Sequence, residues 1–348
     1  MRFQTFLALV LAAALSQSSM GQKSLAAQSA GLPTLPPDPE LAKARELLEK
    51  ANFTAAEAAA RQYVSKHADS ADGHFLLGLI FFREVQSQAR ASGEHLAPGD
   101  LPAAVADSRA RDKKIRDSLA SFTEGAKFGR PSAFDLKIVS FDYVLLGDYV
   151  SADKWLTLAL QWDPSDAQAW YYLGRAKYNE NRFEESIQAF QKCLELHPRH
   201  VLAGDGLGLS YAGLNRSADA IASLQNAILW QENSDQRTPE PLIDLGDLFN
   251  QQARFEEALP ILQKAVAIAP RNIRGHETLG KTFLNLNRLL EAQHELEAAV
   301  SGDPDRAALH YLLGQIYRKQ GQLEKAKLEM ERFQSLKTKE PPPKSGMQ

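Results

Sequence analysis

Residues 167–200 read AQAWYYLGRAKYNENRFEESIQAFQKCLELHPRH, and the spacing of residues in this stretch predicts two short helices. Apolar side chains recur three and four positions apart in both halves, as they do on a helix that buries one face. Gly174 in the first half and Ser186 in the second mark the place where the two helices can cross closely, because larger side chains there would force them apart. Pro198 ends the second half, since the residue before a proline avoids helical backbone. The stretch therefore predicts a helix-turn-helix unit.

The same pattern recurs along the chain. Glycines that follow a leucine are separated by 34, 38, 34 and 34 residues, at Gly174, Gly208, Gly246, Gly280 and Gly314. Twelve residues after these glycines lie only serine or alanine, at Ser186, Ala220, Ala258, Ala292 and Ala326. Prolines close several units at one phase, at Pro164, Pro198, Pro270 and Pro304. A constant period of this length is typical of proteins in which each unit buries its apolar face against its neighbours.

This pattern resembles the tetratricopeptide repeat, a 34-residue helix-turn-helix unit with a small residue at each helix crossing and a closing proline. The resemblance implies an all-α protein, a right-handed superhelical solenoid of about eight repeats. We predict an array over residues 37–340, with units 37–70, 71–132, 133–166, 167–200, 201–238, 239–272, 273–306 and 307–340. The unit 71–132 carries a 28-residue insertion, roughly 86–113, which we expect to lengthen both of its helices. A tail, 341–348, follows the array and is predicted to be disordered.

Residues 203–214, AGDGLGLSYAGL, allow another interpretation, because Gly204, Gly206 and Gly208 resemble a loop that binds a dinucleotide phosphate. Such a loop follows a buried strand and has the spacing G-x-G-x-x-G, whereas residue 209 is leucine and helical patterns flank the stretch. The repeat pattern places Gly208 at a helix crossing and does not account for Gly206. We therefore expect Gly208 to be a packing glycine, and we expect no phosphate-binding loop and no cofactor.

The N-terminus has the layout of a secretory signal peptide. MRFQ carries one positive charge, FLALVLAAAL (6–15) is an apolar core, and SQSSMGQ supplies small residues for cleavage. Ten apolar residues are too few to span a bilayer, which takes about 20. We predict a signal peptide over 1–21, a flexible leader over 22–36, and a protein of the exported bacterial type that is periplasmic or secreted, without a membrane span after cleavage. An uncleaved anchor is the alternative.

Composition and motifs argue against several functions. The chain has 40 basic and 43 acidic residues and a net charge of −3, which offers no general attraction for nucleic acid. Its single cysteine, Cys193, excludes a disulfide within the chain. No G-x-S-x-G or H-E-x-x-H motif occurs. His197 and His200 share one turn but have no third ligand nearby. We expect no catalytic residue and no metal.

The resemblance also implies where partners bind, because members of this family bind them in a concave groove lined by the first helix of each repeat. Counting from the first residue of each unit, positions 2, 5, 9, 12 and 13 face that groove. At its N-terminal end they give the predicted partner-binding residues Phe75, Leu79, Phe82, Phe134, Lys137, Phe141, Leu145, Tyr171, Arg175 and Tyr178. The C-terminal end is polar, with Asp247, Asn250, Gln251, Glu277, Lys281, Gln315 and Arg318. These residues lie off the apolar stripe, so we expect them to be exposed unless the insertion or the leader covers them.

These observations predict an exported, non-catalytic scaffold that binds an extended polypeptide or a protein surface in its groove. The alternative is an accessory subunit of envelope polysaccharide or secretion machinery that contacts glycan or complex partners, with Tyr171 and Tyr178 as glycan contacts. An enzyme is the third option.

Overall fold

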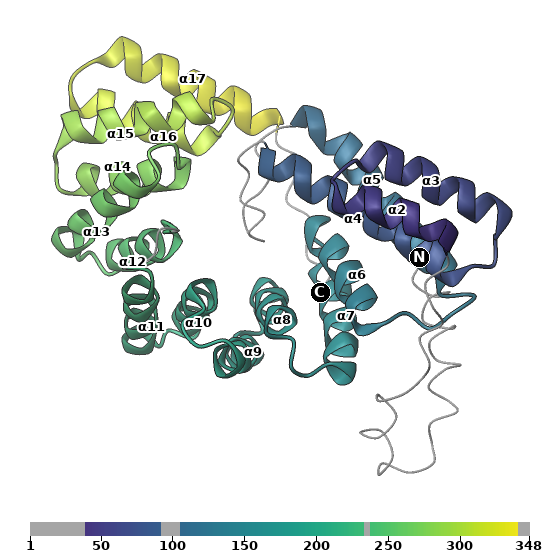
Figure 1. Ribbon diagram of the computed structural model, residues 1–348. Helices are drawn as coiled ribbons and strands as arrows, with labels where there is room; N and C mark the ends of the chain where they lie inside the picture. The colour runs from purple at the N-terminus through teal and green to yellow at the C-terminus, as the bar shows by residue number, and fades with distance from the viewer. Residues whose placement is uncertain (1–38, 92–104, 233–236, 340–348) are drawn as a thin grey trace. The chain divides into compact units, whose positions relative to one another are not determined.

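A computed structural model describes residues 39–91, 105–232 and 237–339 (Figure 1). Within these ranges the chain forms sixteen α-helices and no strand, so the prediction of an all-α protein is confirmed. The predicted signal peptide, the leader, the middle of the insertion and the tail after 340 lie outside the described residues.

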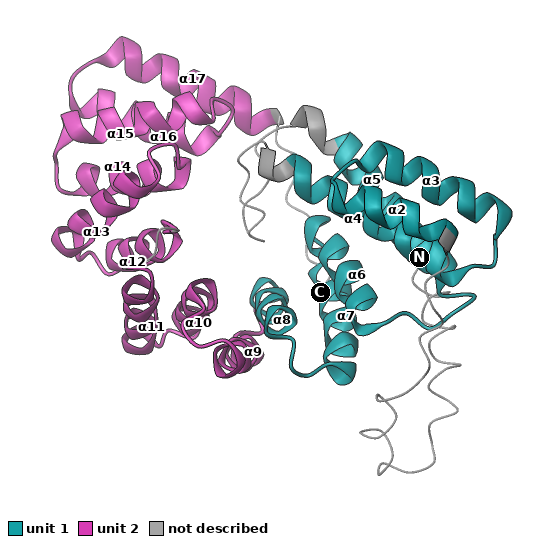
Figure 2. Cartoon of the chain, in the orientation of Figure 1, with its two compact units in different colours: residues 1–180 teal, residues 181–348 magenta. Residues whose placement is uncertain are grey.

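The chain divides into two compact units, residues 1–180 (unit 1) and 181–348 (unit 2), shown in Figure 2. Unit 1 contains α2 (Pro39–Glu49), α3 (Phe53–Lys66), α4 (Ala71–Ala91), α5 (Val105–Gly125), α6 (Ala133–Leu145), α7 (Tyr149–Trp162) and α8 (Ala167–Asn179). Unit 2 contains α9 (Phe183–Leu196), α10 (Val201–Gly213), α11 (Ser217–Trp230), α12 (Glu240–Gln251), α13 (Phe255–Ile268), α14 (Ile273–Asn285), α15 (Leu289–Gly302), α16 (Ala307–Lys319) and α17 (Leu323–Lys339). Each predicted repeat range holds two of these helices.

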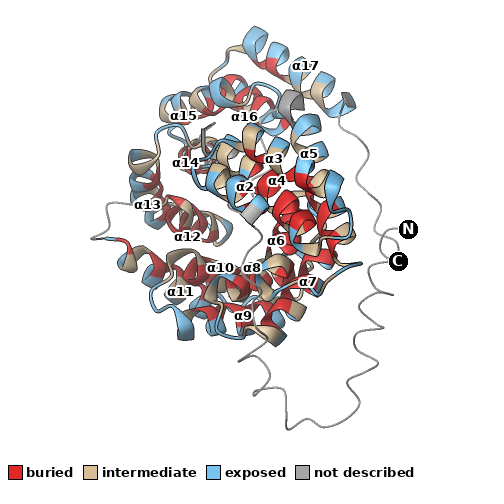
Figure 3. Cartoon of the chain, turned by 45° about the vertical axis from the view of Figure 1, so that its right-hand side comes forward, coloured by how far each residue is buried: buried red, intermediate tan, exposed pale blue. Residues whose placement is uncertain are grey.

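The helices of a repeat cross where the sequence places its small residues. A Cβ atom added to Gly280 would lie 2.7 Å from Leu296 Cγ, and one added to Gly246 would lie 2.4 Å from Leu262 Cγ. Both leucines are fully buried, as are the alanines at the crossing, Ala258 and Ala292. Buried residues accordingly line the facing sides of the helices within each unit (Figure 3). Helix interiors disfavour glycine by about 1 kcal/mol relative to alanine, a cost that this close packing offsets.

The three glycines of 203–214 lie in helix α10 and each faces a large side chain. A Cβ atom would lie 2.6 Å from Trp230 Cζ3 at Gly204, 2.4 Å from Phe190 Cζ at Gly206, and 2.6 Å from Leu224 Cγ at Gly208. The sequence pattern accounted only for Gly208. Gly206 is also a packing glycine, because Phe190 of α9 fills the space that its side chain would occupy.

In every repeat except the second, one position of the turn between the paired helices is left-handed. Position 15 of the repeat has positive φ at Ala51, Gly147, Asn181, Asn215, Ala253, Asn287 and Gly321. Glycine and asparagine tolerate this conformation better than other residues, which explains five of the seven. The backbone then returns a hydrogen bond to the first helix, for example from Arg216 N to Tyr211 O at 2.9 Å. This shared geometry gives these seven turns the same reversal.

The second repeat differs from the others in length. Helices α4 and α5 are each 21 residues long, as expected of an insertion that extends both helices of one repeat. Ile80 of α4 and Ile115 of α5 are fully buried, and Phe82 is 2% exposed. The long α4 supplies one wall of the candidate site described next.

Candidate functional site

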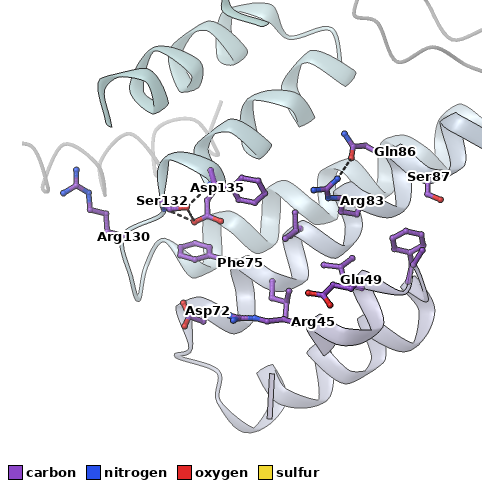
Figure 4. Close-up of a pocket in the computed structure, with 16 residues that line it drawn as sticks. Arg45, Glu49, Asp72, Phe75, Arg83, Gln86, Ser87, Arg130, Ser132 and Asp135 are labelled. Atoms are coloured by element: carbon purple, nitrogen blue, oxygen red, sulfur yellow. Dashed lines mark hydrogen bonds between the residues drawn. The ribbon is translucent and has the colours of Figure 1, made fainter. Parts of the chain in front are cut away.

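Unit 1 contains a groove of about 860 Å³ between α2, α4 and the beginning of α6 (Figure 4). These are the first helices of three successive repeats. The lining residues are Arg45, Leu48, Glu49, Ala51, Phe53, Asp72, Phe75, Leu76, Leu79, Arg83, Gln86, Ser87, Arg130, Ser132, Phe134 and Asp135. The groove therefore crosses three helices and combines aromatic and aliphatic side chains with charged ones.

The apolar residues of the groove are held by their neighbours in different ways. Phe75 packs on Phe122 of α5, with ring centroids 6.1 Å apart, and Gly125 leaves room for it, since a Cβ there would lie 2.6 Å from Phe75 Cδ1. Phe134 lies in the first turn of α6 and is 43% exposed. Ser132 and Asp135 fix that turn as a capping box, in which Ser132 N donates to Asp135 Oδ2 at 2.8 Å. Phe134 is thus an exposed aromatic side chain on a well-fixed helix start.

Three arginines of the groove form no ion pair with any residue that the structure describes. Arg83 Nη1 donates to Gln86 Oε1 at 3.3 Å, and the Arg130 guanidinium lies 4.0 Å from the centroid of the Trp162 ring. Within the described part of the chain, no carboxylate forms a salt bridge with Arg45, Arg83 or Arg130. The guanidinium groups therefore keep donors that a bound ligand can use.

Two of the groove's carboxylates, Asp72 and Asp135, lie near the starts of α4 and α6, and the third, Glu49, ends α2. Burial raises the pKa of Asp135, its hydrogen bonds with Ser132 oppose that shift, and the charge of Asp72 raises it further. Figure 4 shows Asp72 at one end of α4 and Arg83 toward the other, with Phe75 between them. The groove is consequently mixed in charge along its length.

The structure places the ten predicted groove residues differently from one another. Phe75, Leu79 and Phe134 line the groove. Leu145 and Tyr178 are half-buried and do not line it. Lys137 donates to Asp166 at 2.6 Å, and Arg175 Nη1 donates to the hydroxyl of Tyr171 at 3.1 Å.

The expectation of exposure is wrong for three of the aromatic residues. Phe82, Phe141 and Tyr171 are 2%, 7% and 5% exposed. Phe141 of α6 packs on Phe82 of α4, with centroids 6.0 Å apart, and on Tyr172 of α8, with centroids 4.1 Å apart. Tyr172 in turn contacts Tyr171. Large aromatic side chains on successive first helices meet one another here, so they fill the space that smaller side chains would leave open.

Several groove residues were not predicted. Arg45 lies at position 9 of the first repeat, and Arg83 lies at position 13 of the second. Both are groove positions, so applying the pattern fully to these two weaker repeats would have found them. Arg130 precedes α6 and lies outside the repeat pattern. No sequence signal indicated it.

A reversed pair of charges links successive repeats in the two units. In unit 1, Lys137 at position 5 of one repeat pairs with Asp166, the residue before the next repeat, at 2.6 Å. In unit 2, Glu277 at the same position pairs with Arg306, again the residue before the next repeat, at 2.8 Å. At position 5 the repeat thus holds either the basic or the acidic member of the ion pair, and these side chains form contacts between successive repeats.

The polar first helices of unit 2 are also paired internally. Arg274 Nη2 donates to Asp244 Oδ1, and Thr282 Oγ1 donates to Asn250 Oδ1 at 3.0 Å. Burial raises the pKa of Asp205 well above its usual range, and the neighbouring Asp244 raises it further. The buried position of Asp205 and the nearby carboxyl group of Asp244 thus both favour the protonated form of Asp205.

The histidines at position 4 are structural. His276 and His310 each place Nε2 about 3 Å from the carbonyl of the proline six residues earlier, at 3.0 Å and 2.9 Å. Trp170 at this position donates Nε1 to Pro164 O in the same way, at 2.9 Å. In the described ranges no group of three or more His, Cys, Asp or Glu side chains is arranged to hold a metal ion. The buried Cys193 has its pKa raised to about 11 by burial.

His200 caps a helix. Its Nδ1 accepts the backbone N–H of Ala203 at 3.0 Å at the start of α10, so this nitrogen carries no proton. Burial lowers the pKa of His200 from its ordinary 6.5, and the nearby His197 lowers it further.

A pH dependence follows from this cap. As pH falls through about 6.5, the unfolded chain takes up a proton at His200 that the folded chain resists, so stability decreases. The substitution His200→Asn keeps a helix cap like that of Asn272, which accepts from Gly275 N at 2.9 Å. Because asparagine does not take up a proton, this variant should lose about 1 kcal/mol less unfolding free energy than the wild type when the pH is lowered. Urea unfolding of both proteins at about pH 8 and about pH 5.5 measures it. An equal loss of unfolding free energy in the wild type and in His200→Asn would show that His200 does not cause this pH dependence.

Comparison with known proteins identifies the family. One tetratricopeptide repeat model matches residues 41–91, 206–273 and 277–332, and a second matches 167–200. The first alone covers half of the chain, so the chain belongs to the tetratricopeptide repeat family. No helix in the described ranges combines the length and the apolar character needed to cross a membrane.

The curated relatives are larger proteins. The chain is 28% identical over 170 residues to the mouse protein O-mannosyl-transferase TMTC3, covering 46% of this chain and 18% of that protein. It is also 28% identical over 156 residues to the peroxisomal targeting signal receptor of Komagataella phaffii, covering 43% of this chain and 27% of the receptor. The chain thus spans less than a third of either relative.

Solved structures share the fold. A tetratricopeptide repeat protein from Parabacteroides merdae aligns with a TM-score of 0.59 and 16% identity, covering 80% of this chain and 97% of that one. PilW, a widely conserved type IV pilus biogenesis factor, aligns with a TM-score of 0.54 and 18% identity, covering 61% of this chain and 96% of that one. The predicted class of helical repeat solenoid is confirmed.

Proposed function

We propose that this protein is an exported, non-catalytic scaffold that binds an extended polypeptide in the groove of α2, α4 and α6. The groove itself carries the proposal. It crosses three first helices, and it presents Phe134, which is 43% exposed, beside Phe75 and Leu79. Exposed apolar surface of this kind is typical of binding sites.

The polar lining suits a peptide backbone. Gln86 and Ser87 line the groove, and their side chains can donate to or accept from main-chain amides. Arg45 and Arg83 add guanidinium donors with no ion-pair partner among the described residues. An extended chain exposes both its N–H and its C=O groups, so it can satisfy these side chains while its own side chains contact Phe75 and Phe134. A relative named as a receptor for a targeting signal is consistent with a peptide ligand.

The proposed export rests on the sequence of residues 1–21. Cleavage after Gly21 would leave Gln22 as the first residue of the mature protein. Intact-mass measurement of the protein from its native compartment tests this, and a membrane-bound species that retains Met1 would contradict it.

The substitution Phe134→Ala tests the groove. Loss of a central aromatic contact typically costs about 2 kcal/mol or more of binding free energy, so peptides selected from a random library on the wild-type protein should bind the variant roughly 30-fold more weakly. Because Phe134 is exposed, the melting temperature of the Phe134→Ala variant should differ little from that of the wild type. Val150→Ala is the matched control: Val150 is an exposed apolar residue on α7 that does not line the groove. Equal peptide affinity in the wild type and Phe134→Ala would exclude this groove as the site.

A further inference from the structure

We propose that the carboxyl group of Asp142 is protonated in the folded protein, and that its proton completes a hydrogen-bond chain between two walls of the groove of unit 1. The chain runs from Asp142 of α6 through Ser118 of α5 to the carbonyl oxygen of Gly78 in α4. Helices α4 and α6 both line the groove. Loss of the proton at higher pH should therefore weaken peptide binding. This last step rests on the proposed function, since it takes the groove to be the peptide site.

The hydrogen atoms available to this chain require a proton on Asp142. Ser118 Oγ lies 3.0 Å from Gly78 O and 2.6 Å from Asp142 Oδ2. A backbone carbonyl only accepts hydrogen bonds, and a serine hydroxyl has one hydrogen to donate. If Ser118 donates to Gly78 O, the contact at 2.6 Å is a hydrogen bond only when Asp142 carries a proton and donates it to Ser118 Oγ. A carboxylate would leave one of the two contacts without a hydrogen.

The surroundings of Asp142 favour the neutral acid. Asp142 and Ser118 are both fully buried, and Asp142 Oδ1 has no hydrogen-bond partner among the described residues. Burying a carboxylate without full compensation is much more costly than burying a neutral carboxyl group. Burial accordingly raises the pKa of Asp142 well above its usual range, and the hydrogen bond with Ser118 opposes that shift.

The charged side chains of the neighbouring helices pair with one another instead of with Asp142. Lys114 of α5 forms an ion pair with Glu84 of α4, and Lys177 of α8 forms one with Asp153 of α7 at 2.8 Å. Among the described residues, no charged side chain contributes to the pKa of Asp142. An ionised Asp142 would therefore lack a compensating positive charge.

The titratable neighbour of Asp142 on α6 is Tyr143. Burial raises the pKa of Tyr143, the charge of Asp148 raises it further, and Asp142 makes a smaller contribution in the same direction. Tyr143 is uncharged at neutral pH, because its pKa lies above the ordinary value for tyrosine. It supplies no positive charge to Asp142 either.

The other repeats place a neutral side chain where the third repeat has Asp142. Position 10 is buried in the second to eighth repeats, which have there Ile80, Asp142, Ala176, Ser210, Leu248, Thr282 and Ile316. Ser210 lies 2.8 Å from Ser186, the counterpart of Ser118 in its own repeat, and donates to Gly206 O at 2.7 Å. The equivalent contact is thus made between two neutral groups, as we infer for Asp142 and Ser118.

The pH dependence has a definite sign. The unfolded chain releases the Asp142 proton at about pH 4, whereas the folded chain retains it, so stability decreases as pH rises from that value until the folded group also ionises. An ionised Asp142 would accept the hydrogen of Ser118, which could then no longer donate to Gly78 O. The groove walls should consequently be held less firmly at alkaline pH than at acid pH.

The substitution Asp142→Asn tests the proton, because its amide can donate to Ser118 Oγ and does not titrate. In the full chain, the melting temperature of the wild type should fall by roughly 3 °C or more relative to that of Asp142→Asn between about pH 5 and about pH 9. Asp117→Asn is the matched control. Asp117 is one residue from Ser118, but its side chain is 33% exposed and pairs with Lys113, so this variant should keep the wild-type pH profile.

Two further measurements keep the proposal testable if Asp142→Asn folds poorly. Asp142→Thr copies Thr282, the residue at the equivalent position of another repeat, and should also remove the pH dependence. In NMR spectra of the full chain, the carboxyl carbon of Asp142 should have the chemical shift of a protonated acid at neutral pH. The shift of an ionised carboxylate there would overturn the proposal, as would equal pH profiles of stability in the wild type and both variants.

Peptide binding tests the effect on the groove. Peptides selected from a random library on the wild-type protein should bind it severalfold more weakly at about pH 9 than at about pH 5, and Asp142→Asn should bind them equally at both. If the stability profiles differ as expected but binding is independent of Asp142, the proton stabilises unit 1 without controlling the groove, and that part of the inference is wrong. If no peptide binds in a Phe134-dependent manner, the proposed function fails, whereas the melting and NMR results still decide whether Asp142 is protonated.

Discussion

Replacing Gly280 with leucine should lower the free energy of unfolding of unit 2 by several kcal/mol, because it overpacks a helix crossing that has no free space. A Cβ alone at this position would lie 2.7 Å from Leu296 Cγ and 3.1 Å from Leu296 Cδ2. Leu296 is fully buried and belongs to a core cluster that includes residues of α11 to α17, so it cannot move into solvent. The helices α14 and α15 must separate instead.

Gly275→Ala provides a control on the same helix. A Cβ at Gly275 would meet its nearest neighbour, Ile243 Cδ1, at 3.5 Å, which is ordinary contact. Alanine is the better helix former by about 1 kcal/mol, so this variant should be neutral or slightly more stable. Urea unfolding compares the two variants with the wild type. Equal destabilisation by both would show that glycine is required for its backbone and not for space.

The loss in Gly280→Leu should also be local. Repeats contact mainly their neighbours, so stability is approximately a sum along the array. Hydrogen exchange should show lost protection first in α14 and α15 and in the helices packed on them. Uniform loss of protection over both units would contradict this coupling.

Replacing Phe141 with alanine should destabilise unit 1 by about 3–5 kcal/mol, as is usual when a large core aromatic residue is removed. Phe141 is 7% exposed and contacts both Phe82 and Tyr172. Its loss leaves a cavity between α4, α6 and α8 that rigid helices cannot close. Thermal and urea unfolding measure the effect.

Phe134→Ala is the matched control for Phe141→Ala, because it makes the same change on the same helix at an exposed position. Its stability should stay within about 0.5 kcal/mol of the wild type. If Phe141→Ala behaves like Phe134→Ala, Phe141 is not part of the core, and the original expectation of an exposed aromatic surface would be restored.

The sequence was sufficient to predict the helix pairs because the contacts that define them lie within one repeat. Gly246 meets Leu262 and Gly280 meets Leu296, each sixteen residues apart, and Ala292 is buried at the same crossing. Such contacts leave a periodic pattern of small and apolar residues. Gly206 departs from that pattern because its partner, Phe190, belongs to the preceding repeat, where the period of one unit gives no indication of it.

The sequence by itself therefore determined the family, the helical class and three of the groove residues, Phe75, Leu79 and Phe134. Only the tertiary structure decided which groove positions are open. Phe134 and Phe141 occupy groove positions of the same helix, yet one is exposed and the other is buried. The difference arises because the space beside a first helix depends on side chains of the neighbouring first helices, here Phe82 and Tyr172, which lie far from Phe141 in the sequence. The tertiary structure likewise decided which charged groove positions are paired. Lys137 forms an ion pair with Asp166, the residue before the next repeat, whereas Arg45 and Arg83 form no ion pair with any described residue.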